Sequence, residues 1–118
     1  MNRIKMTGQV VKNMPWQEKP KNLAGAPVWR YSDNPVINRN PIKGVSRIFN
    51  SAVIPYNDEF VGVFRGEKLN GIPHIYLGRS RDGINLVFQE NEILFENEDG
   101  KPFMPLYAYD PRVVKIED

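Results

Sequence analysis

Two short turn signals, Asn57-Asp58 and Asp82-Gly83, place the strongest constraint on how this chain folds. Each pair stands between two runs rich in β-branched and aromatic residues, an arrangement that is typical of a β-hairpin. The sequence therefore predicts four consecutive strands that pair in antiparallel order. The predicted strands cover residues 52–56, 59–65, 74–80 and 84–88.

The rest of the chain indicates an all-β protein, because no i, i+3, i+4 apolar pattern persists beyond two helical turns. Prolines and glycines interrupt residues 1–50, which we expect to form an extended N-terminal arm with loops. Trp29 in this arm needs a large surface to pack on. The arm is therefore expected to wrap the body or to dock on another subunit, giving a homo-oligomer. Residues 89–105 are acidic and proline-broken, and are predicted to be a crossing segment.

Asp110 is the leading candidate for a functional carboxylate. Pro111 follows it, and residues 113–116 have the composition of a further strand. Proline disfavours the helical region for the residue before it, so Asp110 is predicted to be extended at the mouth of that strand. Two interpretations are open: a carboxylate aimed at a ligand, with Tyr109 beside it, or an ordinary turn-capping aspartate.

Several other polar residues are candidates for the same site. Asn50 and Ser51 open an apolar run, where their amide and hydroxyl are costly unless hydrogen-bonded by a sugar hydroxyl or by neighbouring backbone. Arg65 ends a row of apolar side chains and either finds a partner or emerges into solvent. His74 begins a predicted strand and is either an edge residue or a ligand contact. Asp82 is assigned a structural role in its turn.

Five ordered motifs in this chain resemble glycoside hydrolase family 130, the β-mannoside phosphorylases. They are Asn34-Pro35, Phe49-Asn50-Ser51-Ala52, Gly62-Val63-Phe64-Arg65, Ser80-Arg81-Asp82-Gly83-Ile84 and Tyr109-Asp110-Pro111-Arg112-Val113. The resemblance runs from about residue 30 to the last residue.

The four predicted strands match one blade of a β-propeller, a unit of about 40–45 residues. Residues 51–118 are then the first blade and the innermost strand of a second, and the resemblance implies the N-terminal part of a five-bladed propeller. A strand with no hairpin partner after it suggests the front of a longer single-domain protein, whose isolated first 118 residues would be inactive. The alternative is a self-contained small β domain.

The resemblance also implies a chemistry: inverting phosphorolysis of mannosyl-glucose or mannooligosaccharides by inorganic phosphate, giving α-mannose 1-phosphate. Phosphate is a co-substrate here, and no cofactor is implied. Asp110 corresponds to the proton donor, Asn50 and Ser51 to residues that hold the mannosyl unit, and Tyr109 to the acceptor site. Arg65 and His74 fall near the same cavity. The family's phosphate-binding Arg, Lys and His residues lie beyond this chain.

Two alternatives to a phosphorylase remain open: a β-mannoside hydrolase of the same fold, and a non-catalytic module for carbohydrate binding or assembly. Composition narrows the remaining classes. The net charge is +2 with scattered basic residues, which does not favour nucleic acid as a partner. The absence of cysteine and the single histidine argue against a disulfide framework and a protein-built zinc site. No apolar run of membrane-spanning or signal-peptide length occurs, so no membrane partner and a cytoplasmic location are expected.

Overall fold

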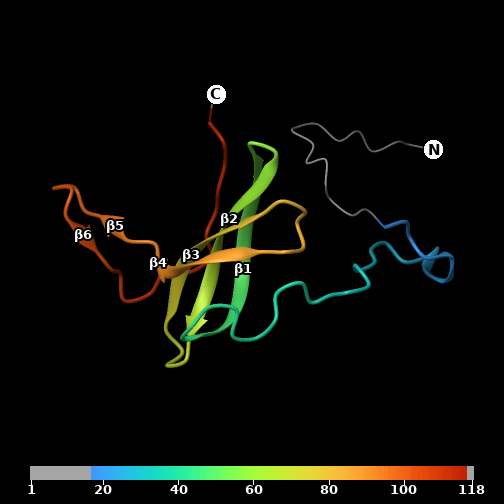
Figure 1. Cartoon of the computed structure of the whole chain (residues 1–118), viewed down its shortest axis with the longest axis horizontal. Helices are drawn as coiled ribbons and strands as arrows, with labels where there is room; N and C mark the ends of the chain where they lie inside the picture. Colours follow the sequence, from blue (N-terminus) through green and yellow to red (C-terminus); the bar gives the residue numbers. More distant parts are fainter. Residues whose placement is uncertain (1–16, 117–118) are drawn as a thin grey trace.

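A computed structural model describes residues 17–116. Its body is a single antiparallel sheet whose strands follow chain order, β1-β2-β3-β4 (Figure 1). The strands are β1 Val45–Tyr56, β2 Glu59–Lys68, β3 Pro73–Ser80 and β4 Val87–Glu92. The prediction of an all-β chain built on a four-stranded meander is confirmed, whereas membership of a propeller blade stays a prediction.

Both predicted turns are present, and one of them moves a strand boundary. Asn57 and Asp58 have positive φ angles of 49° and 61°, the left-handed pair that a tight hairpin turn requires. The second turn is longer than predicted, because β4 begins at Val87 and not at residue 84. The Asp82 carboxylate accepts backbone hydrogen bonds from Ile84 at 2.9 Å and from Asn85 at 2.8 Å, which keeps these residues out of the strand.

The structural role assigned to Asp82 is thereby confirmed. The side-chain amide of Asn85 also donates to this carboxylate, at 2.7 Å. These donors, led by the backbone N–H of Asn85, favour the charged form and hold the pKa of Asp82 well below its usual range.

Other strand boundaries also differ from the predicted ones. The first strand begins at Val45 rather than residue 52, and the second continues to Lys68, because the two pair with each other along this whole length. Residues 89–105 are not only a crossing segment: β4 extends to Glu92, and a small hairpin follows. That hairpin consists of β5 Phe95–Glu96 and β6 Pro102–Phe103.

The predicted strand at residues 113–116 is wrong for this structure. These residues have no strand assignment, because nothing among residues 17–116 pairs with them in a ladder. The segment before them instead crosses the sheet, where the N–H of Ala108 donates to the carbonyl of Pro73 at 3.0 Å.

The main cluster of buried side chains lies on one face of the sheet and depends on close approach to glycine. Val45 and Tyr76 are almost fully buried, with Ile42 from the arm beside them. The ring of Tyr76 lies over Gly66, where a Cβ atom would stand 2.5 Å from a ring carbon. The neighbouring strands can pack at this density only because a side chain is missing there.

The arm runs away from the sheet to one side, and the β5–β6 hairpin projects on the other (Figure 1). The described part of the arm, residues 17–44, is irregular apart from the short 3₁₀ helix η1 Lys21–Leu23 and an isolated bridge at Ile42. The first sixteen residues of the predicted arm lie outside the described residues. Trp29 is 41% exposed, with the Lys19 ammonium 5.8 Å from its ring centre.

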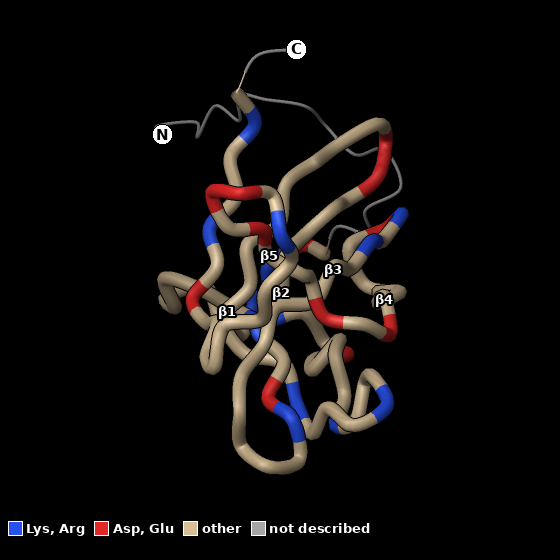
Figure 2. Tube along the Cα trace, turned by 90° about the vertical axis from the view of Figure 1, so that its left-hand side faces the viewer, with Lys and Arg blue, Asp and Glu red and all other residues tan. Residues whose placement is uncertain are grey.

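Charged residues of both signs are interspersed along the described chain (Figure 2). No helix within residues 17–116 has the length and apolar character needed to cross a membrane.

Replacing Gly66 with alanine is expected to lower the free energy of unfolding by about 1–3 kcal/mol, because the added methyl group overlaps the buried Tyr76 ring. Gly25→Ala is the matched control, since nothing lies within 4 Å of the methyl group it adds. Urea unfolding of both variants checks this. Equal stability of the two variants would contradict the packing argument.

Candidate active site

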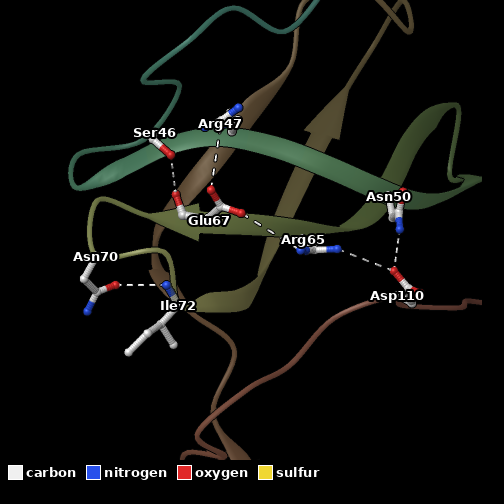
Figure 3. Close-up of polar contacts among 8 residues, drawn as sticks. All are labelled: Ser46, Arg47, Asn50, Arg65, Glu67, Asn70, Ile72 and Asp110. Atoms are coloured by element: carbon white, nitrogen blue, oxygen red, sulfur yellow. Dashed lines mark hydrogen bonds and ion pairs between the residues drawn. The ribbon is translucent and has the colours of Figure 1, made fainter.

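A β-bulge in β1 builds the centre of the site. Phe49 pairs with Arg65 and Ser51 pairs with Phe64, so Asn50 is an extra residue without a partner on β2. A bulge bends the strand and redirects a side chain, and such bulges are common beside active sites. The Asn50 amide accordingly points to Asp110, sixty residues later in the chain, and donates a hydrogen bond to its Oδ1 atom (Figure 3).

Asp110 has a backbone conformation that the sequence analysis did not predict. Its φ angle is +51°, in the left-handed region, rather than the extended value expected before Pro111. Two contacts hold this segment: Arg112 Nη1 donates to the carbonyl of Pro111 at 2.9 Å, and the Asn50 amide donates to the Asp110 side chain. Left-handed conformations of residues other than glycine concentrate at functional sites.

Arg65 is the second group that contacts Asp110, with Nη1 3.9 Å from Oδ1. Its guanidinium lies 5.2 Å from the ring centre of Phe49 and 5.8 Å from that of Tyr109. Its Nε atom is buried without a hydrogen-bond partner. Of the two interpretations of Arg65, the one in which it finds a partner is confirmed.

The structure therefore brings together Asn50, Arg65, Tyr109 and Asp110. Tyr109 is 62% exposed and lines a cavity of about 600 Å³, together with Tyr107, Pro111 and Arg112 from the same segment. An exposed aromatic ring that lines a cavity, with a half-exposed carboxylate on the next residue, suits a ligand that offers both hydroxyl groups and an apolar face.

Ser51 is not part of this group. It pairs with Phe64 and lines a different cavity, of about 580 Å³, between the arm and the sheet. Trp29 and Tyr31 line the same cavity. The Ser51 hydroxyl donates to the carbonyl of Phe49 at 3.4 Å, so backbone satisfies it here.

His74 also lies away from Asp110. It pairs with Gly66, whereas Arg65 pairs with Ile75, so the two side chains stand on opposite faces of the sheet. His74 is buried, and its Nδ1 atom has no hydrogen-bond partner. Burial lowers the pKa of His74, as does the nearby charge of Lys68, while Glu92 opposes the shift.

Sequence reasoning missed three members of the site: Phe49, Arg47 and Glu67. Glu67 could have been found, since it stands two residues after Arg65 and alternation puts both on one face. Its Oε2 atom lies 4.0 Å from Arg65 Nη2, and its Oε1 atom lies 3.7 Å from Arg47 Nε. Arg47 could not have been found, because its position opposite Glu67 depends on the bulges. No cluster of metal-ligating side chains occurs in the described part of the chain.

The arrangement provides one carboxylate with an amide and a guanidinium against it, beside an aromatic cavity. The model of the family described as β-1,4-mannooligosaccharide phosphorylase matches residues 9–118. The chain belongs to glycoside hydrolase family 130. The match covers all five motifs that carried the resemblance. The predicted membership of family 130 is therefore confirmed.

A curated relative in this family is the β-1,4-mannooligosaccharide phosphorylase of Ruminococcus albus. It is 38% identical over 119 aligned positions, which include 96% of this chain. The chain spans 35% of the length of that relative.

The lowered pKa of His74 predicts a pH-dependent stability. In the unfolded chain a histidine titrates near pH 6.5, so the unfolded state binds more protons than the folded state just below that pH. The free energy of unfolding is therefore expected to fall as the pH decreases from about 7 to about 5, and His74→Gln is expected to reduce this slope.

Urea unfolding of both proteins at about pH 7.5 and about pH 5.5 measures the effect, because carboxylates titrate mainly below this window. The same pH dependence in wild type and variant would show that His74 contributes nothing to it.

Proposed function

We propose that the protein containing this chain is an inverting β-mannoside phosphorylase and that Asp110 is its proton donor. The observation that carries the proposal is the Asp110 carboxylate itself, in a left-handed conformation and contacted by Asn50 and Arg65. Membership of family 130 and the name of the Ruminococcus albus relative support the phosphorylase activity.

In the proposed reaction, an oxygen of inorganic phosphate attacks the anomeric carbon of the β-mannosyl unit. The bond from that carbon to the glycosidic oxygen breaks, and the oxygen takes up a proton that originates on Asp110. The resemblance implies that this proton passes through a mannose hydroxyl. Attack from the face opposite the leaving sugar inverts the configuration and gives α-mannose 1-phosphate.

A single acid is sufficient for this chemistry, because phosphate arrives as a charged nucleophile and needs no base. A hydrolase would need a second carboxylate to activate water. Within residues 17–116, the polar contacts of the Asp110 carboxylate are an amide and a guanidinium, and the nearby Glu67 carboxylate is directed at Arg65. The choice of phosphorolysis over hydrolysis is supported by the family and by the name of the relative.

The neighbouring groups have separate proposed roles. The Asn50 amide and the Arg65 guanidinium orient the Asp110 carboxylate and offer donors to hydroxyls of the mannosyl unit. Tyr109, exposed at the cavity edge, stacks on the acceptor sugar. Sugar contacts by Ser51 and His74, the homo-oligomer assembled through the arm and the five-bladed propeller remain predictions.

Cleavage of β-1,4-mannobiose by the complete protein is expected to require inorganic phosphate and to release α-mannose 1-phosphate. Incubation with and without phosphate, followed by phosphorus and proton NMR of the product, tests this. Equal release of free mannose in both samples would assign the protein to the hydrolases.

Asp110→Asn is expected to lower turnover by about 10²–10⁴-fold, because the amide keeps the shape of the side chain but cannot supply the proton. Asp99→Asn in the loop before β6 is the control, and it should retain full activity. A variant at position 110 that keeps more than about a tenth of the wild-type rate would remove Asp110 from the role of proton donor.

A further inference from the structure

Arg65 lies between two carboxylates. Its Nη1 atom is 3.9 Å from Asp110, and its Nη2 atom is 4.0 Å from Glu67 (Figure 3). The side chains of Arg65 and Glu67 are only 27% and 23% exposed, so water screens this contact less than it screens a surface ion pair. Each of the two outer nitrogens of the guanidinium therefore faces a carboxylate.

The two carboxylates behave differently during the proposed reaction. A proton donor is neutral before it gives up its proton and charged afterwards, so Asp110 attracts Arg65 strongly in only one of these states. Glu67 has no such task, and its carboxylate remains available as the partner of Arg65 in both states. Without Glu67, neutral Asp110 would leave Arg65 without a charged partner in its present position.

Glu67 is itself fixed from β1. Arg47 Nε lies 3.7 Å from Glu67 Oε1, and the Ser46 hydroxyl donates to the backbone carbonyl of Glu67 at 3.0 Å. Ser46 is the extra residue of a second bulge, which brings Arg47 opposite Glu67. The charges therefore alternate along the row Arg47, Glu67, Arg65 and Asp110.

From this geometry we propose that Glu67 is a positioning residue of the active site. It keeps the Arg65 guanidinium against the Asp110 carboxyl group and the sugar site while Asp110 is protonated. The proposal rests on the proposed function, in which Asp110 is the proton donor.

The first test compares Glu67→Gln with Glu59→Gln in the complete protein. The two glutamates make a matched pair: both lie on β2, both side chains are 23% exposed, and each contacts an arginine. Glu59 contacts Arg79, on β3, so of the two glutamates only Glu67 contacts Arg65. In phosphorolysis of β-1,4-mannobiose, Glu67→Gln is expected to lower kcat about 10- to 100-fold, as misplacement of an active-site group does. Glu59→Gln should retain the wild-type kcat and KM.

The second test measures binding without turnover. In an Asp110→Asn background the side chain at position 110 is permanently neutral, as in the protonated state. Adding Glu67→Gln to this background should weaken β-1,4-mannobiose binding, measured calorimetrically without phosphate, by about tenfold or more, since Arg65 then has neither carboxylate. Adding Glu59→Gln should leave binding unchanged. Melting temperatures of all variants identify any loss of fold.

The outcomes separate the two proposals. Activity of Asp110→Asn near the wild-type level overturns the proton donor, whatever position 67 does. If Asp110→Asn is inactive but Glu67→Gln behaves like Glu59→Gln in both assays, the positioning role of Glu67 is overturned and the proton donor is not. If Glu67→Gln fails to fold, Glu67→Asp is used in its place. This substitution moves the carboxylate away from Arg65 by one methylene. Unchanged binding of β-1,4-mannobiose by Glu67→Asp in the Asp110→Asn background overturns the proposal.

Discussion

The antiparallel pairing of β1 with β2 is the constraint on which both the core and the candidate site depend. From the hairpin turn the two strands pair without interruption up to Ser51 and Phe64, and then two bulges shift the register. Between the bulges, Phe49 stands opposite Arg65, and Ile48 turns to the face that carries the core. One stretch of backbone therefore supplies both a buried side chain and the support of a charged site.

Electrostatics and packing act together around Arg65. A guanidinium with a buried Nε atom is costly unless charge and hydrogen-bonding partners compensate. Here two carboxylates contact its outer nitrogens, and the rings of Phe49 and Tyr109 both lie within the range of cation–π attraction. The arrangement restricts Arg65 to one position, which is the condition under which a neighbouring carboxyl group can be oriented for catalysis.

The two faces of the sheet have different surroundings, and the predicted site residues are divided between them. Asn50 and Ser51 are adjacent in sequence, yet one contacts Asp110 and the other lines the cavity beneath the arm. Arg65 and His74 lie on neighbouring strands, yet they too stand on opposite faces. The cavity with Ser51, Trp29 and Tyr31 is mostly apolar, unlike the charged row that ends at Asp110.

The sequence by itself determined the all-β class, the order of the four strands, both turns and the family, because turn pairs, period-two alternation and local motifs act over a few residues. It also singled out Asp110, Asn50 and Arg65. Only the tertiary structure decided the strand bounds, the left-handed Asp110, the lack of a strand at residues 113–116 and the row from Arg47 to Asp110. A bulge changes which face a side chain occupies without leaving a clear mark in the sequence, and the ion pair between Arg65 and Asp110 depends on the folded path of the chain between them.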